Sequence, residues 1–376
     1  MSLSRRRFLT NTTLSAAGIP LLATLGSDFC EASTENPIDW SMGFPGDAVL
    51  LNRNENPIGP SSAAIEAAKN GIARSFRYAD PDSIRGLLAE HHSLEKDEIL
   101  VGTGSGEILK IAPLVFARDG NVVATLESYR QCPAFSEKLG SSVKWVNLRK
   151  HKNYSYDVKG LIEAVDDKTG LLFAVTPNNP TGTILPYEDM KIIADSLPRH
   201  VLFVIDEAYV HFQKEGKSGI DLVKEGYNNV LVTRTFSKAY ALAGLRCGYG
   251  IGHPDIMKKI SNFGCGPTST NMAGFGAAIA SLADDAHLQR SRKFVSDTRK
   301  FYQTQFSRLG ITTLSGPPIF IMAEFGDRTS EISAELRKQK IYVRDGKEWA
   351  LPNHIRISYG YEQENQAFFR AIKKLI

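Results

Sequence analysis

Short runs of mostly apolar residues recur between residues 98 and 233, and amphipathic or polar stretches separate them. Runs of this length without a polar face predict strands that are buried on both sides of a sheet. The predicted strands are 98–101, 121–126, 143–148, 171–176, 201–205 and 230–233, with helices between them at 108–116 and 188–197. Such alternation is typical of an α/β fold with a mostly parallel central sheet sandwiched by helices.

The pattern changes at about residue 267. Helices are predicted at 274–282, 286–309 and 362–375, and strands at 311–314, 319–325, 341–343 and 355–359. This mixture predicts a smaller α/β C-terminal domain of antiparallel character. The predicted organisation is an N-terminal arm with part of the small domain at 33–73, a large domain at 74–266 and the small domain at 267–376.

Reactive groups follow the ends of the predicted strands. Ser105 and Gly106 lie in a glycine-rich turn whose backbone amides, at the start of a helix, can bind an anion. Asp206 ends an apolar strand, where a buried carboxylate is unfavourable unless a cationic or protonated group meets it. Desolvation of Lys238 would lower its pKa and make its amine nucleophilic, and Arg246 offers donors suited to a phosphate. Open α/β sheets bind ligands at these strand ends, so we expect one site there.

Several motifs lie in a fixed order along the chain. The segment 235–246 reads Thr-Phe-Ser-Lys-Ala-Tyr-Ala-Leu-Ala-Gly-Leu-Arg, and Asn-Pro-Thr-Gly (179–182) and Asp-Glu-Ala-Tyr (206–209) precede it. Further upstream are an arm, Asn-Glu-Asn-Pro-Ile-Gly-Pro (54–60), and Arg-Tyr-Ala-Asp (77–80). Together they resemble fold-type I pyridoxal-phosphate-dependent aminotransferases of class I/II, in the histidinol-phosphate aminotransferase branch. The likeness runs from about Leu51 to the C-terminus.

This resemblance implies pyridoxal 5'-phosphate as cofactor and a homodimer with shared active sites. Lys238 would bind the cofactor and then act as general base and acid, and Asp206 would keep the ring nitrogen protonated. Tyr209 and Asn179 would reach the phenolic oxygen of the cofactor, and Tyr129 would stack on its ring.

The resemblance also implies residues for the two ends of the site. Those implied to hold the cofactor phosphate are Ser105, Gly106, Thr235, Ser237 and Arg246, with Tyr78 reaching across the dimer. Arg356, together with Asn179, would bind the α-carboxylate of the substrate, and Arg344 is a candidate for its distal end.

The implied activity is ping-pong transamination between an amino acid and a 2-oxo acid. Histidinol phosphate with 2-oxoglutarate is an alternative substrate pair, but residues 37–40 lack the expected Pro-Tyr pair, and Ile319 stands near where relatives carry asparagine. Gly106 and Glu127 also depart from the family pattern. A decarboxylase, racemase or lyase of the same fold, and a non-catalytic protein that binds the cofactor, remain alternatives.

Composition and cysteine spacing bear on two further classes of function, nucleic-acid binding and metal binding. The chain has 376 residues and a formal net charge of +4, which gives no indication of a nucleic-acid surface. Its four cysteines show no metal-ligand spacing, and we expect Cys132, Cys247 and Cys265 to be buried. No metal site is expected, and His91 and His92 are expected to be solvated at a helix end.

The first 32 residues match a twin-arginine export signal. Ser-Arg-Arg-Arg-Phe-Leu (4–9) precedes a modest apolar stretch that is too short for a stable membrane span, and cleavage after Ala32 would fit. We therefore expect a periplasmic enzyme without a membrane span in the mature chain. The location would be cytoplasmic if the signal were not functional.

Overall fold

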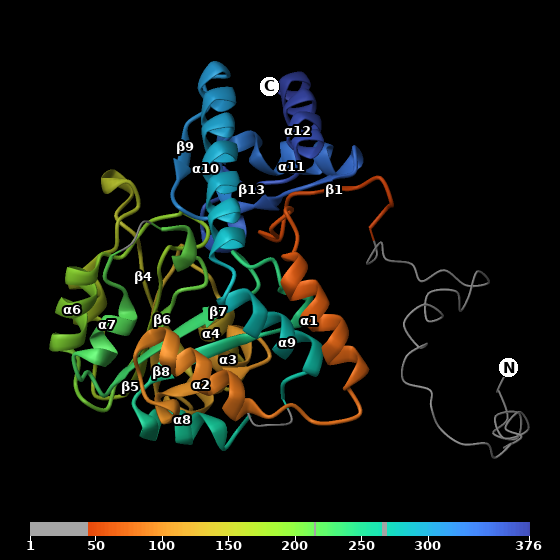
Figure 1. Cartoon of the computed structure of the whole chain (residues 1–376). Helices are drawn as coiled ribbons and strands as arrows, with labels where there is room; N and C mark the ends of the chain where they lie inside the picture. Colours follow the sequence, from red (N-terminus) through yellow and green to blue (C-terminus); the bar gives the residue numbers. More distant parts are fainter. Residues whose placement is uncertain (1–43, 214–215, 265–268) are drawn as a thin grey trace, which may run out of the picture. The chain divides into compact units, whose positions relative to one another are not determined.

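The computed structural model describes residues 44–213, 216–264 and 269–376. The predicted export signal and Cys265 therefore lie outside the described residues. Within the unit Asp47–Ile376, a seven-stranded sheet has the order β2-β8-β7-β6-β5-β3-β4 (Figure 1). The strands are β2 (Ile99–Gly102), β3 (Asn121–Thr125), β4 (Ser142–Val146), β5 (Thr169–Val175), β6 (Leu202–Asp206), β7 (Val230–Thr235) and β8 (Gly248–Gly252). Strands β3 to β7 pair in parallel and β8 is antiparallel to both neighbours, which confirms a mostly parallel sheet.

Both faces of this sheet are covered by helices, because successive strand residues enter different apolar cores. In β5, Leu172 and Ala174 belong to one core, whereas Leu171 and Phe173 belong to the other. The helices of the first core are α1 (Ser62–Ala73), α2 (Pro81–His92), α5 (Val158–Glu163), α6 (Tyr187–Ser196), α7 (Gly219–Lys224) and α9 (Met272–Leu282). Those of the second are α3 (Ser105–Phe116), α4 (Gln131–Lys138) and α8 (Pro254–Ser261).

The C-terminal part contains a second, antiparallel sheet with the order β12-β13-β10-β9. Its strands are β9 (Thr313–Ser315), β10 (Phe320–Glu324), β12 (Arg344–Asp345) and β13 (His354–Ser358). The helices α10 (Asp285–Arg308), α11 (Thr329–Lys338) and α12 (Glu362–Leu375) pack on it through a shared apolar core (Figure 1). This arrangement confirms the smaller α/β C-terminal domain.

The N-terminal arm joins the small domain. Strand β1 (Val49–Leu50) pairs in parallel with β11 (Ile341–Tyr342), and Leu51 is buried in the core of the small domain. The backbone N–H of Ser358 donates to the carbonyl of Leu51 over 2.9 Å. These bonds hold the polar residues that follow Leu51 beside the end of the large sheet.

Helices α1 and α9 pack closely, and their buried residues belong to the core of the large sheet. Small residues allow the contact, since a Cβ on Gly71 would lie 2.3 Å from the carbonyl oxygen of Met272. The predicted domain boundaries at residues 73 and 266 would put both helices outside the large domain. These boundaries stay predictions, although α1 and α9 share the apolar core of the large sheet.

Some local features differ from the sequence-based expectations. Strand β8 was not predicted because its alternating glycines give no apolar run, and a Cβ on Gly248 would lie 2.3 Å from the amide nitrogen of Ser105. His92 was wrongly expected to be solvated: it is buried, and its Nε2 lies 3.0 Å from the hydroxyl of Tyr249. Cys132 and Cys247 are buried as predicted.

None of the helices in the described ranges is long and apolar enough to cross a membrane. Among the same residues, no cluster of three or more His, Cys, Asp or Glu side chains could hold a metal ion.

The contact between α1 and α9 predicts a specific sensitivity to substitution. Gly71→Ala should lower the free energy of unfolding by roughly 1–3 kcal/mol, because the new methyl group would meet backbone atoms that cannot rotate away. Gly216→Ala is the control, since a Cβ there has no neighbour within 4 Å among the described residues. Equal stability of both variants in urea denaturation would contradict this account.

Candidate active site

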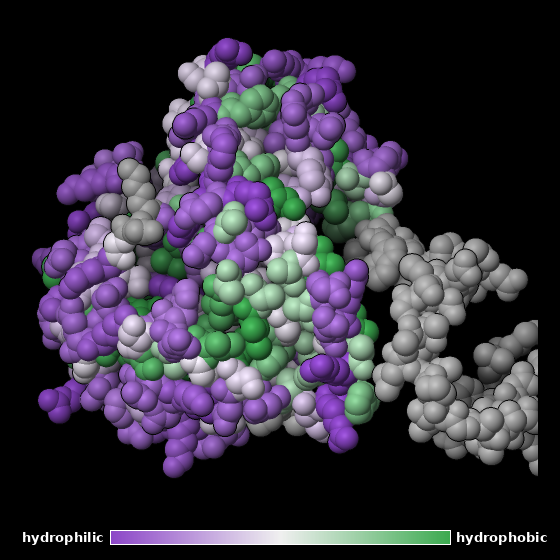
Figure 2. Space-filling model, viewed as in Figure 1, coloured by the Kyte–Doolittle hydropathy of each residue, from purple (hydrophilic) through white to green (hydrophobic). Residues whose placement is uncertain are grey.

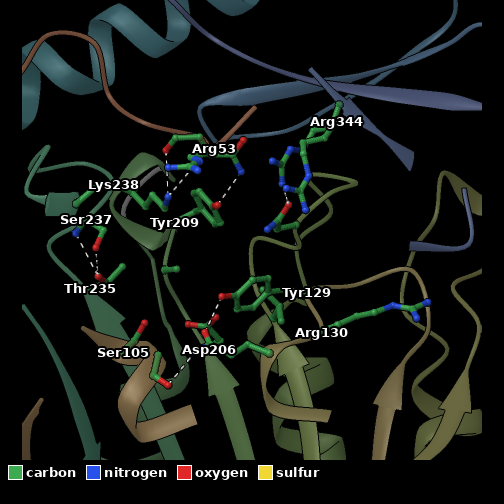
Figure 3. A pocket seen from close by; sticks show the side chains of 18 of the residues that line it. Arg53, Ser105, Tyr129, Arg130, Asp206, Tyr209, Thr235, Ser237, Lys238 and Arg344 are labelled. Atoms are coloured by element: carbon green, nitrogen blue, oxygen red, sulfur yellow. Dashed lines mark hydrogen bonds between the residues drawn. The ribbon is translucent and has the colours of Figure 1, made fainter. Parts of the chain in front are cut away.

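A cavity of about 550 Å³ lies where the carboxyl ends of the parallel strands face the arm and the small domain. Figure 3 shows polar side chains from separate strands converging on it. Most of the predicted site residues line this cavity: Ser105, Gly106, Tyr129, Asn179, Asp206, Tyr209, Thr235, Ser237, Lys238, Arg246, Arg344 and Arg356. Tyr78 does not line it and is 83% exposed on the loop after α1.

Lys238 follows β7 and extends its amine toward the arm (Figure 3). Its Nζ donates to the carbonyl oxygens of Arg53 and Asn54 over 3.1 and 3.2 Å. Desolvation, with the nearby positive charge of Arg356, lowers the pKa of Lys238 to about 8. A substantial fraction of this amine is therefore neutral, and nucleophilic, at mildly alkaline pH.

Asp206 is the last residue of β6 and is only 2% exposed. The hydroxyl of Thr233 donates to its Oδ1 over 3.0 Å, and no ion pair with a described side chain neutralises it. Burial raises the pKa of Asp206 to about 7, and the charge of Lys238 lowers it only in part. A protonated ring nitrogen in the cavity would supply the missing cationic partner.

A group of amides and one arginine forms the opposite wall. The guanidinium of Arg356 in β13 donates to Oδ1 of Asn179 and to the carbonyl of Asn52, both over 2.6 Å. The side-chain amide of Asn54 donates to the hydroxyl of Tyr209 over 2.8 Å. Arg356 is 4% exposed and stacks 4.8 Å from the centre of the Trp349 ring. The arm thus orients both Arg356 and Tyr209.

The start of α3 forms a cradle for an anion. Gly104 precedes the helix with a φ of +77°, and a Cβ there would lie 2.5 Å from Nη2 of Arg246. Arg246 is anchored by donation to the carbonyls of Ala243 and Thr103 over 2.9 and 3.3 Å.

Two hydroxyl groups lie beside this guanidinium, since Thr235 donates to Oγ of Ser237 over 2.9 Å and Nη1 of Arg246 donates to the same Oγ over 3.5 Å. A helix N-terminus, two hydroxyls and a guanidinium together suit a phosphate.

Two departures from the family pattern have local compensations. Glu127 is buried, and its Oε2 accepts a hydrogen bond from the backbone N–H of Leu148 over 2.8 Å. Beside Gly106, the side chain of Gln131 occupies the space that a larger residue would need. Neither partner could be found from the sequence, because each lies on a separate element.

The distal part of the cavity also contains residues that the sequence did not suggest. Arg344 donates to both carboxylate oxygens of Glu348, over 2.8 and 2.5 Å, and lies 5.7 Å from the Trp349 ring centre. The candidate for the distal substrate group is thus already paired with an acid. Glu348 and Trp349 lie in a short 3₁₀ helix (Gly346–Trp349), where no pattern marks a binding residue.

These features define a class: an α/β fold in which one lysine amine, an anion cradle and a buried carboxylate line the same cavity. The family described as aminotransferase class I and II matches residues 46–372, and the chain belongs to this family.

Individual relatives agree with this assignment. The chain is 33% identical to histidinol-phosphate aminotransferase 2 of Pseudomonas fluorescens over 341 residues, which cover 88% of this chain and 90% of the relative. It is 32% identical to histidinol-phosphate aminotransferase 1 of Nitrosococcus oceani over 333 residues, or 88% and 89% of the two chains.

Solved structures share the fold. Histidinol-phosphate aminotransferase from Sinorhizobium meliloti, in complex with pyridoxal-5'-phosphate, has a TM-score of 0.80 and 26% identity, with 87% of this chain and 91% of that chain covered. Aspartate aminotransferase from Thermus thermophilus has a TM-score of 0.78 at 22% identity, covers 88% and 92%, and is similar in fold alone. The protein is a pyridoxal-phosphate-dependent transaminase of fold type I.

The residues present fit this cofactor. The cavity volume of about 550 Å³ lies within the usual range for small-molecule sites. A phosphate would meet the cradle at α3, and the ring nitrogen would meet Asp206. Nε of Arg356 and Oδ1 of Asn52 are buried without a hydrogen-bond partner among the described residues, and polar atoms of a ligand could satisfy them.

The raised pKa of Asp206 predicts a pH-dependent stability of the cofactor-free protein. The folded state binds this proton more tightly than the unfolded state, whose ordinary pKa is 3.8, so stability falls as pH rises from about 4 to about 7. Asp206→Asn removes the penalty and should increase the free energy of unfolding by about 2–4 kcal/mol at pH 8. The gain should shrink as the pH is lowered toward 4.

Denaturation of cofactor-free wild type and variant at several pH values would measure this difference. The exposed Asp119→Asn serves as the control. A gain that is the same at pH 4 and pH 8 would show that the carboxylate is not the cause.

Proposed function

We propose that Lys238 is the catalytic residue of a ping-pong transamination and that Asp206 and Tyr209 tune the cofactor. When bound, pyridoxal phosphate supplies a ring that withdraws electrons from the α-carbon of the substrate. The observation that carries this proposal is the lysine amine with its pKa lowered to about 8, in one cavity with a buried carboxylate and an anion cradle.

Lys238 would hold the cofactor through Nζ and be released when an amino acid takes its place. Its amine could then accept a proton from the α-carbon and return it to the cofactor carbon on the other side of the shared nitrogen, as a general base and acid. A pKa near 8 suits both directions of transfer at neutral pH. Asp206 would hold the proton of the ring nitrogen, and Tyr209 and Asn179 would donate to the phenolic oxygen.

Arg356 would bind the α-carboxylate of the substrate. Its guanidinium is fixed by Asn179, the carbonyl of Asn52 and the Trp349 ring, so a carboxylate would meet a donor that is already oriented. Ser105, Gly106, Thr235, Ser237 and Arg246 would hold the phosphate. Arg344 remains a candidate for binding the distal group of the substrate, and that group would compete with Glu348 for the guanidinium.

A homodimer would bring Tyr78 to the phosphate of the other subunit. The support is that four large hydrophobic side chains are exposed: Ile72, Phe76, Tyr78 and Phe263. Hydrophobic residues also gather over the neighbouring α9 on the face drawn in Figure 2. A second copy of the chain would bury side chains that are unfavourable in water. A monodisperse, active monomer in light scattering would contradict this proposal.

We favour an amino-acid substrate over histidinol phosphate. Ile319 is fully buried in the small-domain core, so an apolar residue stands near the position where an asparagine was expected. Residues 37–40, which lack the Pro-Tyr pair, lie outside the described residues. The names of the curated relatives keep the histidinol-phosphate reaction as the alternative.

The N-terminal 32 residues support a periplasmic location through the twin-arginine route. This route transports folded proteins, which suits an enzyme that acquires its cofactor before export. A cytoplasmic location would follow if the signal were not functional.

Lys238→Ala should abolish the absorption of lysine-bound cofactor and reduce turnover by several orders of magnitude, because both the attachment point and the proton-transfer group are lost. Absorption spectra and initial rates would measure the two effects. Lys138→Ala, on the exposed side of α4, is the control. Wild-type turnover in the Lys238 variant would overturn the assignment.

A half-reaction screen would identify the substrate. Cofactor-loaded enzyme is mixed with single amino donors, including acidic, neutral and aromatic amino acids and histidinol phosphate, without an acceptor. We expect at least one amino acid to convert the bound cofactor to its amine form faster than histidinol phosphate does. Fastest conversion by histidinol phosphate would favour the alternative, and no conversion by any donor would favour a non-catalytic binding protein.

A further inference from the structure

One side chain connects two walls of the cavity. Gln131 is the first residue of α4 and lines the cavity. Its Oε1 accepts a hydrogen bond from the hydroxyl of Tyr129 over 2.6 Å, and its Nε2 donates to the carbonyl of Gly106 over 3.2 Å. Tyr129 follows β3, whereas Gly106 lies in the first turn of α3. The amide thus joins the proposed ring-stacking residue to the proposed phosphate cradle.

The chemistry of the partners fixes the orientation of this amide. The carbonyl of Gly106 can only accept, so it must face the NH₂ group of Gln131. The oxygen of the amide then faces Tyr129, whose hydroxyl must donate. Burial raises the pKa of Tyr129, so this hydroxyl keeps its proton at neutral pH.

Gly106 is required for this arrangement. A Cβ at position 106 would lie 2.8 Å from Nε2 and 2.9 Å from Oε1 of Gln131. The side-chain amide therefore fills the volume that any larger residue would take. Because the contact involves the far end of a flexible side chain, a methyl group at 106 would displace Gln131 without forcing the backbone to move.

We propose that Gln131 is a positioning residue, which sets the Tyr129 ring at a fixed height above the α3 cradle and so orients the bound cofactor. This inference rests on the proposed roles of Tyr129 and Gly106. Loss of the amide would leave the Tyr129 hydroxyl without its partner and free the ring to rotate about two side-chain bonds. The distance between the Tyr129 ring and the α3 cradle would then no longer be fixed.

A double-mutant cycle tests the proposal on the full-length chain. The proteins are wild type, Gly106→Ala, Gln131→Ala and the double variant, with Gln303→Ala as a control that removes an exposed amide from α10. Pyridoxal phosphate is titrated into each cofactor-free protein, and the circular dichroism of the bound cofactor reports the orientation of its ring. Unfolding in urea is measured in parallel.

Each single variant should raise the Kd for pyridoxal phosphate about 3- to 10-fold and reduce the cofactor dichroism, as expected for the loss of one or two hydrogen bonds. The double variant should match the worse single variant, because both changes remove the same contact. Tyr129→Phe should give a similar Kd, with no further loss when Gln131→Ala is added.

Multiplicative effects of the two changes, or an unchanged Kd and dichroism in Gln131→Ala, would overturn the proposal. A purely structural role would reduce the free energy of unfolding but leave the dichroism of the cofactor unchanged, which also contradicts it. Failure of the proposed function is distinct, since wild type itself would then show no absorption of lysine-bound cofactor.

Discussion

The buried carboxylate of Asp206 is the constraint on which the site depends. It lies at the end of a fully buried strand, with one side-chain donor and no described ion pair. A charge in this position is unfavourable, so the pocket favours a ligand that brings a positive group to it. The same low-polarity surroundings keep the Lys238 amine partly neutral. One environment therefore prepares both the acid and the amine for the same cofactor.

The cavity is lined by residues of the large sheet and by residues of the arm and the small domain. The large sheet positions Asp206 and Lys238 at its strand ends, whereas Asn52 and Asn54 orient Arg356 and Tyr209 from the arm. The arm is itself held by its bonds to β11 and β13. The orientation of Arg356 and Tyr209 therefore depends on how the arm and the small domain pack.

Two positions that depart from the family pattern, Gly106 and Glu127, have partners that lie elsewhere in the chain. Gly106 leaves space that the amide of Gln131 fills, and Glu127 uses its carboxylate to bind the backbone of Leu148. These two departures from the family pattern are each matched by a partner on another element. A position that looks incomplete in one motif can thus be complete in three dimensions.

The sequence by itself determined the parallel sheet and the strand ends that carry Tyr129, Asn179, Asp206 and Lys238. Apolar runs report burial on both faces directly, and parallel strands must end at one edge. It could not reveal β8, whose glycines serve the close approach of α3, nor the burial of His92. The pairing of Arg344 with Glu348 and the contact of Gln131 with Tyr129 and Gly106 were decided only by the tertiary structure. Such contacts join side chains from separate elements, and no periodicity in the sequence records which of these residues meet.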